Sequence, residues 1–311
     1  MNELTTTNHN EMIHPFLQVW TWQIPVYLFL GGLVAGLMII SGYFLFTGKY
    51  KSAGSIASRL PVISLVLLSL GMFALFLDLE HKMYVWRVYT TFRVSSPMSW
   101  GSWILLLVYP ALLANILINP PAFLSKYIPD PAELYRKEED SQKLIRGVAI
   151  VNMGLGILVG TYTGILLSTL GARPLWNTSI LWLLFLISGL SSAAALVHLI
   201  SKDNNEKSML VKADNSLLAV EIFVILMMII GLLSSSRAHI EAVRLILSGP
   251  FAASFWVLVI GIGILIPLFL QILTLKEKVK HSAIPAILVI AGGIVLRFII
   301  VYAGQYSSYH Q

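Results

Sequence analysis

The sequence contains no cysteine, so the chain can form no disulfide and offers no thiolate to an iron–sulfur cluster. Charged residues are also scarce, because they make up 12% of the chain against about 25% in soluble domains. So few charges cannot cover a surface that faces water. Since hydrophobic residues make up 57% of the chain, the composition predicts an integral membrane protein whose basic residues lie in loops and bind no nucleic acid.

The histidines are placed unfavourably for haem. A b-type haem in a membrane is commonly held by two histidines on facing helices. The seven histidines lie at positions 9, 14, 81, 198, 239, 281 and 310, and only His198 falls well inside an apolar segment of the sequence. No glycine-rich nucleotide loop is present, and no metal ligands are expected. If the chain handles electrons, its carrier is therefore expected to be diffusible, such as a quinone.

Eight apolar segments are long enough to cross a bilayer, which takes about 20 residues in a helix. None shows the strict alternation of a membrane β-strand. The predicted spans are Trp20–Phe46, Leu60–Leu79, Ser99–Ile118, Leu144–Leu170, Thr178–Ile200, Asn215–Ser236, Phe251–Leu273 and Ala283–Tyr302. The sequence thus predicts an all-α integral membrane protein forming one domain over residues 1–311.

The loop cations predict the orientation, because cytoplasmic loops carry an excess of Lys and Arg. Of the 21 basic residues, one face carries 14, the other face carries six, and Arg297 lies within the last span. The richer face is expected to be cytoplasmic, which places both termini outside. The polar segment 1–16 is then an uncleaved outer tail, since it lacks the positive charge that opens a signal peptide. Residues 119–143 form a cytoplasmic loop.

The segment His81–Pro97 mixes aromatic and basic side chains just after the second span. Such a segment can lie in the membrane interface with its rings at headgroup depth. It can also dock a partner protein, and both interpretations stand.

Glycines repeat at intervals of four in two of the predicted spans. Gly32 and Gly36 lie in the first, and Gly156, Gly160 and Gly164 lie in the fourth. This spacing lets helix backbones approach closely, so it predicts helix packing.

Polar residues at membrane depth are costly and suggest function by default. Most of them lie toward the outer side: Gln23, Tyr27, Asp78, His81, Tyr162, Arg173 and Arg297. Structural roles remain open for them. The tyrosines can be interfacial aromatics, Asp78 and His81 can lie among headgroups, and Arg173 can be a loop charge. Arg297 needs a partner, such as Asp78 or a ligand.

The inner half holds fewer polar residues, among them His198 and Glu221, which could pair with each other. Glu221, Met228 and Ser235 also follow one stripe at a spacing of seven residues. A proton path along this stripe is an open alternative.

A quinone suits the outer group of residues chemically. Its carbonyl oxygens need hydrogen-bond donors, which Tyr and Gln supply, and its reduced hydroxyls need a proton acceptor, such as Asp or His. Apolar walls can hold an isoprenoid tail.

Four stretches make the chain resemble the NrfD-like family, the membrane subunits of polysulfide reductase and related respiratory complexes. They are WTWQIPVYLFLGGLVAG (20–36), DLEHKMYVWRVYTTFRVSSPMSWGSWILLLVYP (78–110), GTYTGILLSTLGARPLWN (160–177) and LFLISGLSSAAAL (184–196). Together with the span count, the resemblance covers most of the chain.

The resemblance implies two side-by-side four-helix bundles in a bacterial inner membrane, with periplasmic termini. It implies a haem-free subunit that binds menaquinol or menaquinone. Electrons would pass to or from a periplasmic four-cluster iron–sulfur subunit, and a molybdopterin or cytochrome subunit would complete the complex.

Carried over by position, the quinone-binding residues are Gln23, Tyr27 and Tyr162, with Asp78 and His81 in proton exchange. Arg173 falls in the ARPLWN stretch and can shape the pocket mouth; Arg297 is a further candidate. Some family members have Asn and His where this chain has Ile24 and Tyr27.

Two functions of other classes remain open. Glu221, His198 and Arg297 could serve an ion or solute transporter or a proton-translocating module. The protein could also be a passive membrane anchor.

Overall fold

The computed structural model describes residues 20–51, 56–124, 126–127, 138–276 and 282–308. The predicted outer tail, 1–16, and part of the predicted loop 119–143 lie outside the described residues.

Within the described residues, the regular structure is helical and contains no β-strand. Eight long apolar helices confirm the eight predicted spans. They are α1 (Gln23–Phe46), α2 (Leu60–Asp78), α4 (Pro97–Ile118), α6 (Glu138–Ser168), α7 (Leu181–Ile200), α8 (Asn204–Leu233), the π-helical stretch η3 (Ser254–Leu265) continued by α10 (Ile266–Leu275), and α11 (Ile284–Tyr306). The short elements are η1 (Lys49–Lys51), η2 (Lys82–Tyr84), α3 (Trp86–Thr90) and α9 (Arg237–Leu247).

Most helix ends agree with the predicted spans, and α8 differs most. It begins at Asn204, well before the predicted start at Asn215. Asp203 caps the helix, because its carboxylate accepts a hydrogen bond from the Asn205 backbone N–H at 3.0 Å. Polar residues in the first turns therefore continue the helix beyond its apolar part.

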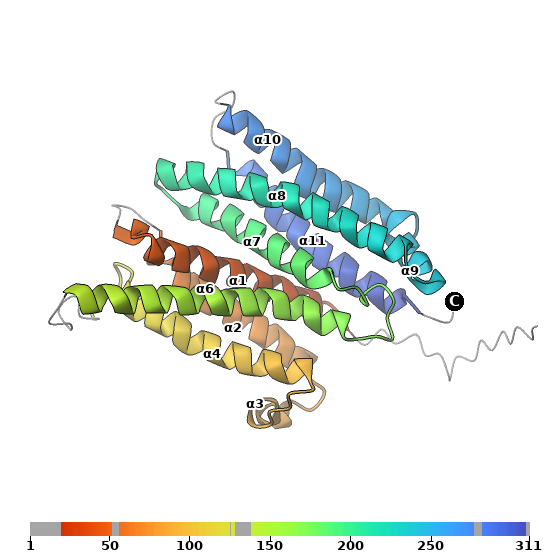
Figure 1. Cartoon of the computed structure of the whole chain (residues 1–311), viewed down its shortest axis with the longest axis horizontal. Helices are drawn as coiled ribbons and strands as arrows, with labels where there is room; N and C mark the ends of the chain where they lie inside the picture. The colour runs from red at the N-terminus through yellow and green to blue at the C-terminus, as the bar shows by residue number, and fades with distance from the viewer. Residues whose placement is uncertain (1–19, 52–55, 125, 128–137, 277–281, 309–311) are drawn as a thin grey trace, which may run out of the picture.

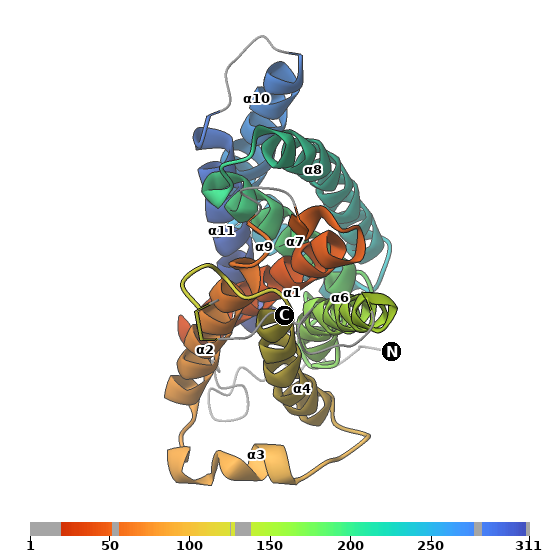
Figure 2. The same ribbon diagram turned by 90° about the vertical axis from the view of Figure 1, so that its left-hand side faces the viewer.

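The long helices run alongside one another, with α1 at the centre (Figure 1, Figure 2). α1 packs against α2, α6, α7 and α11. α4 contacts both α2 and α6, while α10 contacts both α8 and α11. α7 connects α1 and α6 on one side with α8 and α11 on the other, because it contacts all four helices.

Close helix contacts depend on the glycines, as the sequence predicted. A Cβ atom on Gly36 would stand 2.8 Å from the carbonyl oxygen of Gly189 on α7, and one on Gly189 would stand 2.6 Å from the carbonyl oxygen of Gly32. A Cβ on Gly156 would come within 2.8 Å of the Ala35 carbonyl oxygen. The backbones of α1, α6 and α7 therefore touch directly.

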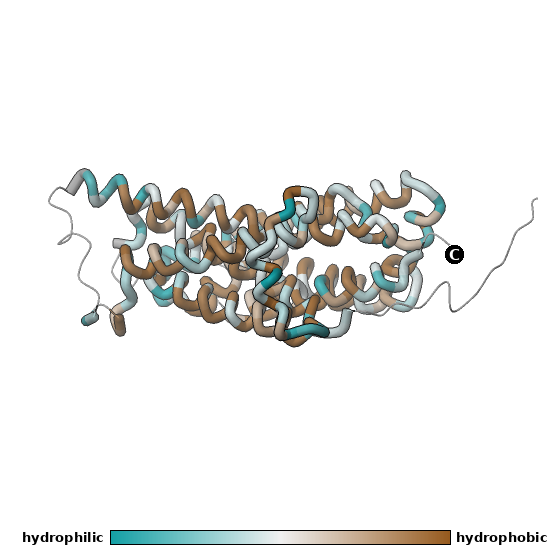
Figure 3. Tube along the Cα trace, turned by 90° about the horizontal axis from the view of Figure 1, so that it is seen from below, coloured by the Kyte–Doolittle hydropathy of each residue, from teal (hydrophilic) through white to brown (hydrophobic). Residues whose placement is uncertain are grey.

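The two ends of the molecule differ in charge and in local structure. The end with α3, α9 and the 169–180 connection is called here the α3 end; the opposite end, with Lys49, Arg59, Lys202 and Lys276, is called the basic end. Hydrophobic residues occupy the length between them (Figure 3). Large apolar side chains such as Leu107 and Phe223 point outward there, as expected for helices that face lipid.

Candidate functional site

A cavity of about 300 Å³ lies at the α3 end, among α1, α2, α3, α4 and α6. Its walls are mainly aliphatic and aromatic, and include Leu28, Met72 and Leu105. Its volume is at the lower limit of ligand pockets, which measure about 300–1,000 Å³. Four acidic or phenolic side chains interrupt the apolar lining: Tyr27, Asp78, Tyr89 and Tyr162.

These four polar groups come from four different elements. Tyr27 lies one turn into α1, and Tyr162 lies near the end of α6; both are buried. Asp78 is the last residue of α2, and Tyr89 lies on α3. The cavity therefore gathers, in three dimensions, residues that are up to 135 positions apart in the sequence.

The Tyr162 ring is placed by a glycine on the facing helix. A Cβ atom on Gly101 of α4 would overlap the phenol ring and hydroxyl of Tyr162. The ring occupies the space that a side chain at position 101 would need. Gly101 therefore lets the phenol reach the cavity.

The segment that forms one wall of the cavity is held by side chains of α4. The Ser102 hydroxyl donates to the Val88 carbonyl oxygen at 3.0 Å, and the Ser99 hydroxyl donates to that of Thr91 at 3.2 Å. The Trp100 indole N–H donates to the Val94 carbonyl oxygen at 2.6 Å. α3 runs across the direction of the long helices (Figure 1, Figure 2), and these bonds fix it there.

The two faces of this segment differ. Val85, Val88 and Tyr89 line the cavity, whereas Met83 and Trp86 are exposed. Burial raises the pKa of Tyr89, and the neighbouring phenol of Tyr109 adds to the shift. The Tyr89 phenol therefore stays protonated and can donate a hydrogen bond.

The sequence does not single out Tyr89. Residues 81–97 are rich in aromatic side chains, but neither interfacial packing nor partner docking assigns one of these rings to a cavity. α3 is five residues long, and its side chains face the cavity only because the chain turns back toward α4. No periodicity in so short a stretch could have singled out Tyr89.

The structure brings together Tyr27, Asp78 and Tyr162 and leaves the other candidate residues outside the cavity lining. The Gln23 side chain instead accepts a hydrogen bond from the Thr21 hydroxyl. His81 is exposed, and its ring packs edge-on against Tyr84 at 6.4 Å between ring centres.

Arg173 binds the end of α11, away from the cavity lining. Its guanidinium donates to the carbonyl oxygens of Gln305 at 2.7 Å and Ser307 at 2.9 Å. Partial burial lowers the pKa of Arg173, although arginine stays protonated in proteins. Beside it, the Trp176 indole N–H donates to the Ile300 carbonyl oxygen at 2.8 Å. Arg173 thus connects the 169–180 segment to α11.

Arg297 does not pair with Asp78, which corrects one expectation. It is 1% exposed, donates to the Phe185 carbonyl oxygen at 2.9 Å, and stands 4.1 Å from the centre of the Phe185 ring. Its charge acts on Glu221, which hydrogen-bonds Ser188. The groups that act on the Glu221 carboxyl are thus Ser188 and Arg297.

The arrangement can bind a flat molecule with oxygen atoms at its edge. Three phenols can donate to carbonyl oxygens, one carboxyl can exchange protons, and the apolar walls can enclose a ring. Within the described residues, no group of three or more His, Cys, Asp or Glu side chains could hold a metal ion.

Comparison with known proteins gives a consistent result over nearly the whole sequence. The family model described as polysulphide reductase, NrfD, matches residues 5–307. A polysulfide reductase chain from Wolinella succinogenes is 31% identical over 304 residues, covering 92% of this protein and 94% of that one. Protein NrfD of Escherichia coli is 30% identical over 308 residues, covering 92% and 95%. A selenate reductase subunit from Mesobacillus selenatarsenatis is 24% identical over 318 residues, covering 91% and 73%.

Proposed function

Because the chain belongs to the NrfD family of membrane proteins, we propose that it is the haem-free, quinone-binding membrane subunit of a respiratory oxidoreductase complex. It exchanges electrons between menaquinol or menaquinone and an iron–sulfur subunit that docks at the α3 end. The observation that carries this proposal is the apolar cavity with three phenols and one carboxyl.

Each polar residue of the cavity has a role in this proposal. The phenols of Tyr27, Tyr89 and Tyr162 donate hydrogen bonds that hold the quinone oxygens. Asp78, at the end of α2, exchanges the two protons of the quinone oxygens one after the other and passes each between the cavity and the α3 end. A bound quinol supplies two electrons and two protons. The apolar walls keep water away from the ring.

The proposal includes an orientation in the bacterial inner membrane. The basic end faces the cytoplasm, and the α3 end faces the periplasm together with both termini. The cation excess at Lys49, Arg59, Lys202 and Lys276 supports this assignment. We assign α1, α2, α4 and α6 to one four-helix bundle and the remaining four spans to a second, in keeping with the helix contacts.

The metal centres must lie on other proteins, because this one has no cysteine for a cluster. Two relatives are named as parts of larger enzymes, one as a chain of polysulfide reductase and the other as a subunit of selenate reductase. By analogy, we expect a four-cluster iron–sulfur partner and a molybdopterin or cytochrome catalytic subunit. The exposed Met83 and Trp86, beside the cavity wall, are candidates for that docking surface.

A titration of the purified protein with a fluorescent quinol analogue tests the proposal. We expect saturable quenching near one site per molecule, weakened by Tyr162→Phe and by Asp78→Asn. Tyr43→Phe is a matched control, because Tyr43 lies near the opposite end of α1 and lines no part of the cavity. The absence of saturable quenching in folded protein, both alone and in its complex, would refute quinone binding and leave an anchor or a transporter.

A second candidate function, an ion- or proton-translocating module, is favoured by the charged residues buried outside the cavity. Glu221 on α8 and Arg297 on α11 are buried, and neither lines the cavity. Flux of a solute or ion into liposomes that contain this protein without a redox partner would support transport. Quinol binding without such flux would support the first proposal.

A further inference from the structure

A second buried carboxyl lies outside the cavity, toward the basic end. Asp214 on α8 is 2% exposed. Its carboxylate accepts hydrogen bonds from the Ser191 hydroxyl on α7 and from the Gln271 side-chain N–H on α10, each at 2.6 Å. Both partners are neutral. The hydrogen bonds hold the carboxylate in place without cancelling its charge.

Arg297, a buried arginine on α11, acts on a different carboxyl. Arg297 is the charge that faces Glu221, and within the described residues no lysine or arginine lies within ion-pair distance of Asp214. A carboxylate at membrane depth is costly unless an opposite charge accompanies it. A proton or a bound cation must therefore neutralise Asp214, because the described lysines and arginines do not.

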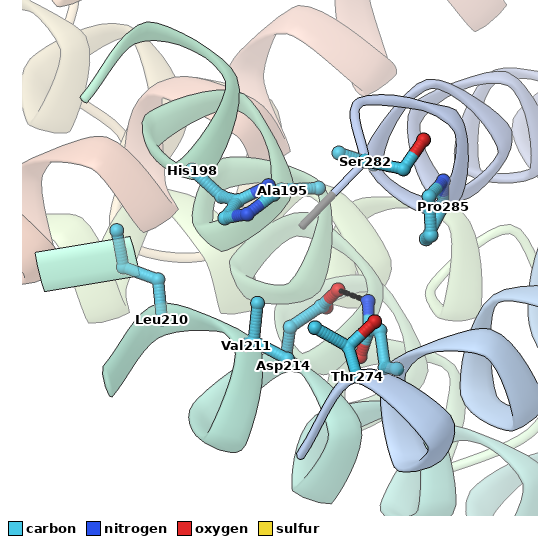
Figure 4. A pocket seen from close by; sticks show the side chains of 10 residues that line it. Ala195, His198, Leu210, Val211, Asp214, Thr274, Ser282 and Pro285 are labelled. Atoms are coloured by element: carbon cyan, nitrogen blue, oxygen red, sulfur yellow. Dashed lines mark hydrogen bonds between the residues drawn. The ribbon is translucent and has the colours of Figure 1, made fainter. Parts of the chain in front are cut away.

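A small pocket adjoins this carboxyl. Its volume is about 10 Å³, which is close to the space that one water molecule occupies. Asp214 and Thr274 both point into it (Figure 4), and Gln271 and Ser282 also line it. The His198 ring from α7 completes its polar lining. The pocket therefore has room for one water molecule or one small ion, and the Asp214 carboxylate forms part of its wall.

Other oxygen atoms in the wall are available to a ligand. The Gln271 side-chain oxygen is buried and has no hydrogen-bond partner. The Thr274 hydroxyl donates its proton to the Leu270 carbonyl oxygen at 2.9 Å, which leaves its lone pairs free. The Ser282 oxygen accepts from the Ile284 backbone N–H at 3.2 Å. The polar wall therefore presents mainly oxygen acceptors.

We propose that this pocket binds one monovalent cation of sodium's size. Hard cations prefer carboxylate, carbonyl and hydroxyl oxygens, which Asp214, Gln271 and Thr274 supply. One carboxylate balances one positive charge, whereas a divalent ion would leave an excess charge in apolar surroundings. The small volume admits the ion only after it sheds its water.

The position of the pocket gives the ion a route from the basic end. Thr274 is the penultimate residue of α10, and Ser282 lies just before α11. Both are partly exposed, whereas Asp214 and Gln271 are buried. The ion would enter past the hydroxyls and stop at the carboxylate. This site is separate from the cavity at the α3 end and does not depend on quinone binding.

Binding of radioactive sodium to the purified full-length protein tests the proposal. In choline buffer, the wild type should bind about one ion per molecule, displaced by unlabelled sodium and not by choline. Asp214→Asn, which keeps the shape of the side chain, should weaken binding at least about tenfold. Thr274→Val should weaken it and Thr274→Ser should retain it.

Glu206→Gln provides the matched control. Glu206 is also a buried carboxyl on α8 near the basic end, but it accepts from the Ser201 hydroxyl at 2.7 Å and does not line the pocket. Its variant should bind sodium as the wild type does. If folded wild type binds no sodium and Asp214→Asn removes the infrared band of a protonated carboxyl, a proton neutralises Asp214 and the proposal is overturned. Equal sodium binding by Asp214→Asn would overturn it as well.

Discussion

The phenol of Tyr162 on α6 occupies the space beside Gly101 on α4 where a side chain would otherwise stand. This relationship connects helix packing to the cavity. The glycine leaves room for the buried phenol, which lines the cavity together with Tyr27 and Asp78. A single methyl group at position 101 would therefore act on the proposed quinone site without altering any group that contacts the quinone.

Gly101→Ala should displace the Tyr162 ring and weaken binding of the quinol analogue by about tenfold, a loss of roughly 1.4 kcal/mol. Fluorescence titration measures the affinity for the quinol analogue. Gly154→Ala on α6 is the control, since a Cβ there meets no atom within 4 Å, and it should bind as the wild type does. Unchanged affinity in Gly101→Ala would mean that Tyr162 makes no contact with the bound molecule.

Trp100→Phe should loosen the segment around α3. It removes the hydrogen bond from the indole to the Val94 carbonyl oxygen and keeps an aromatic ring, so about 0.5–1.5 kcal/mol of local stability is lost. Backbone amides of residues 85–96 should exchange with deuterium faster, while those of α7 should not change. Trp182→Phe on α7 is a control, because Trp182 lies outside this segment. Unaltered exchange at 85–96 would show that the hydrogen bonds from Ser99 and Ser102 hold the segment in place without the Trp100 bond.

The sequence could predict the eight spans because each has a long, predominantly apolar run. It could predict three cavity residues because each is a polar or phenolic side chain at the outer side of such a run. It could not predict Tyr89, whose position depends on how the short α3 turns back toward α4. Asp214 was missed for a different reason. It stands one residue before the predicted span at Asn215, where a charge looks like part of a solvated loop, and only the early start of α8 at Asn204 brings it inside.

Arg173→Gln tests whether this arginine is part of the site or of the scaffold. The variant loses two charge-assisted hydrogen bonds to the end of α11. Because part of the side chain is exposed to solvent, we expect the free energy of unfolding to fall by about 1–3 kcal/mol. We expect a lower melting temperature with unchanged affinity for the quinol analogue. Lower affinity at an unchanged melting temperature would place Arg173 at the mouth of the cavity, as the sequence had suggested.

Arg297→Met should destabilise the protein more than any of these changes. It leaves Glu221 buried beside Ser188 without the charge of Arg297, and an uncompensated buried charge costs about 3–5 kcal/mol. Glu221→Gln should cost less, because Gln still hydrogen-bonds Ser188. The double variant should recover part of the loss from Arg297→Met, since it removes both charges. Thermal unfolding of the four proteins, compared as a double-mutant cycle, measures the coupling. Additive losses would mean that the two charges do not stabilise each other, and Glu221 would then carry a proton instead.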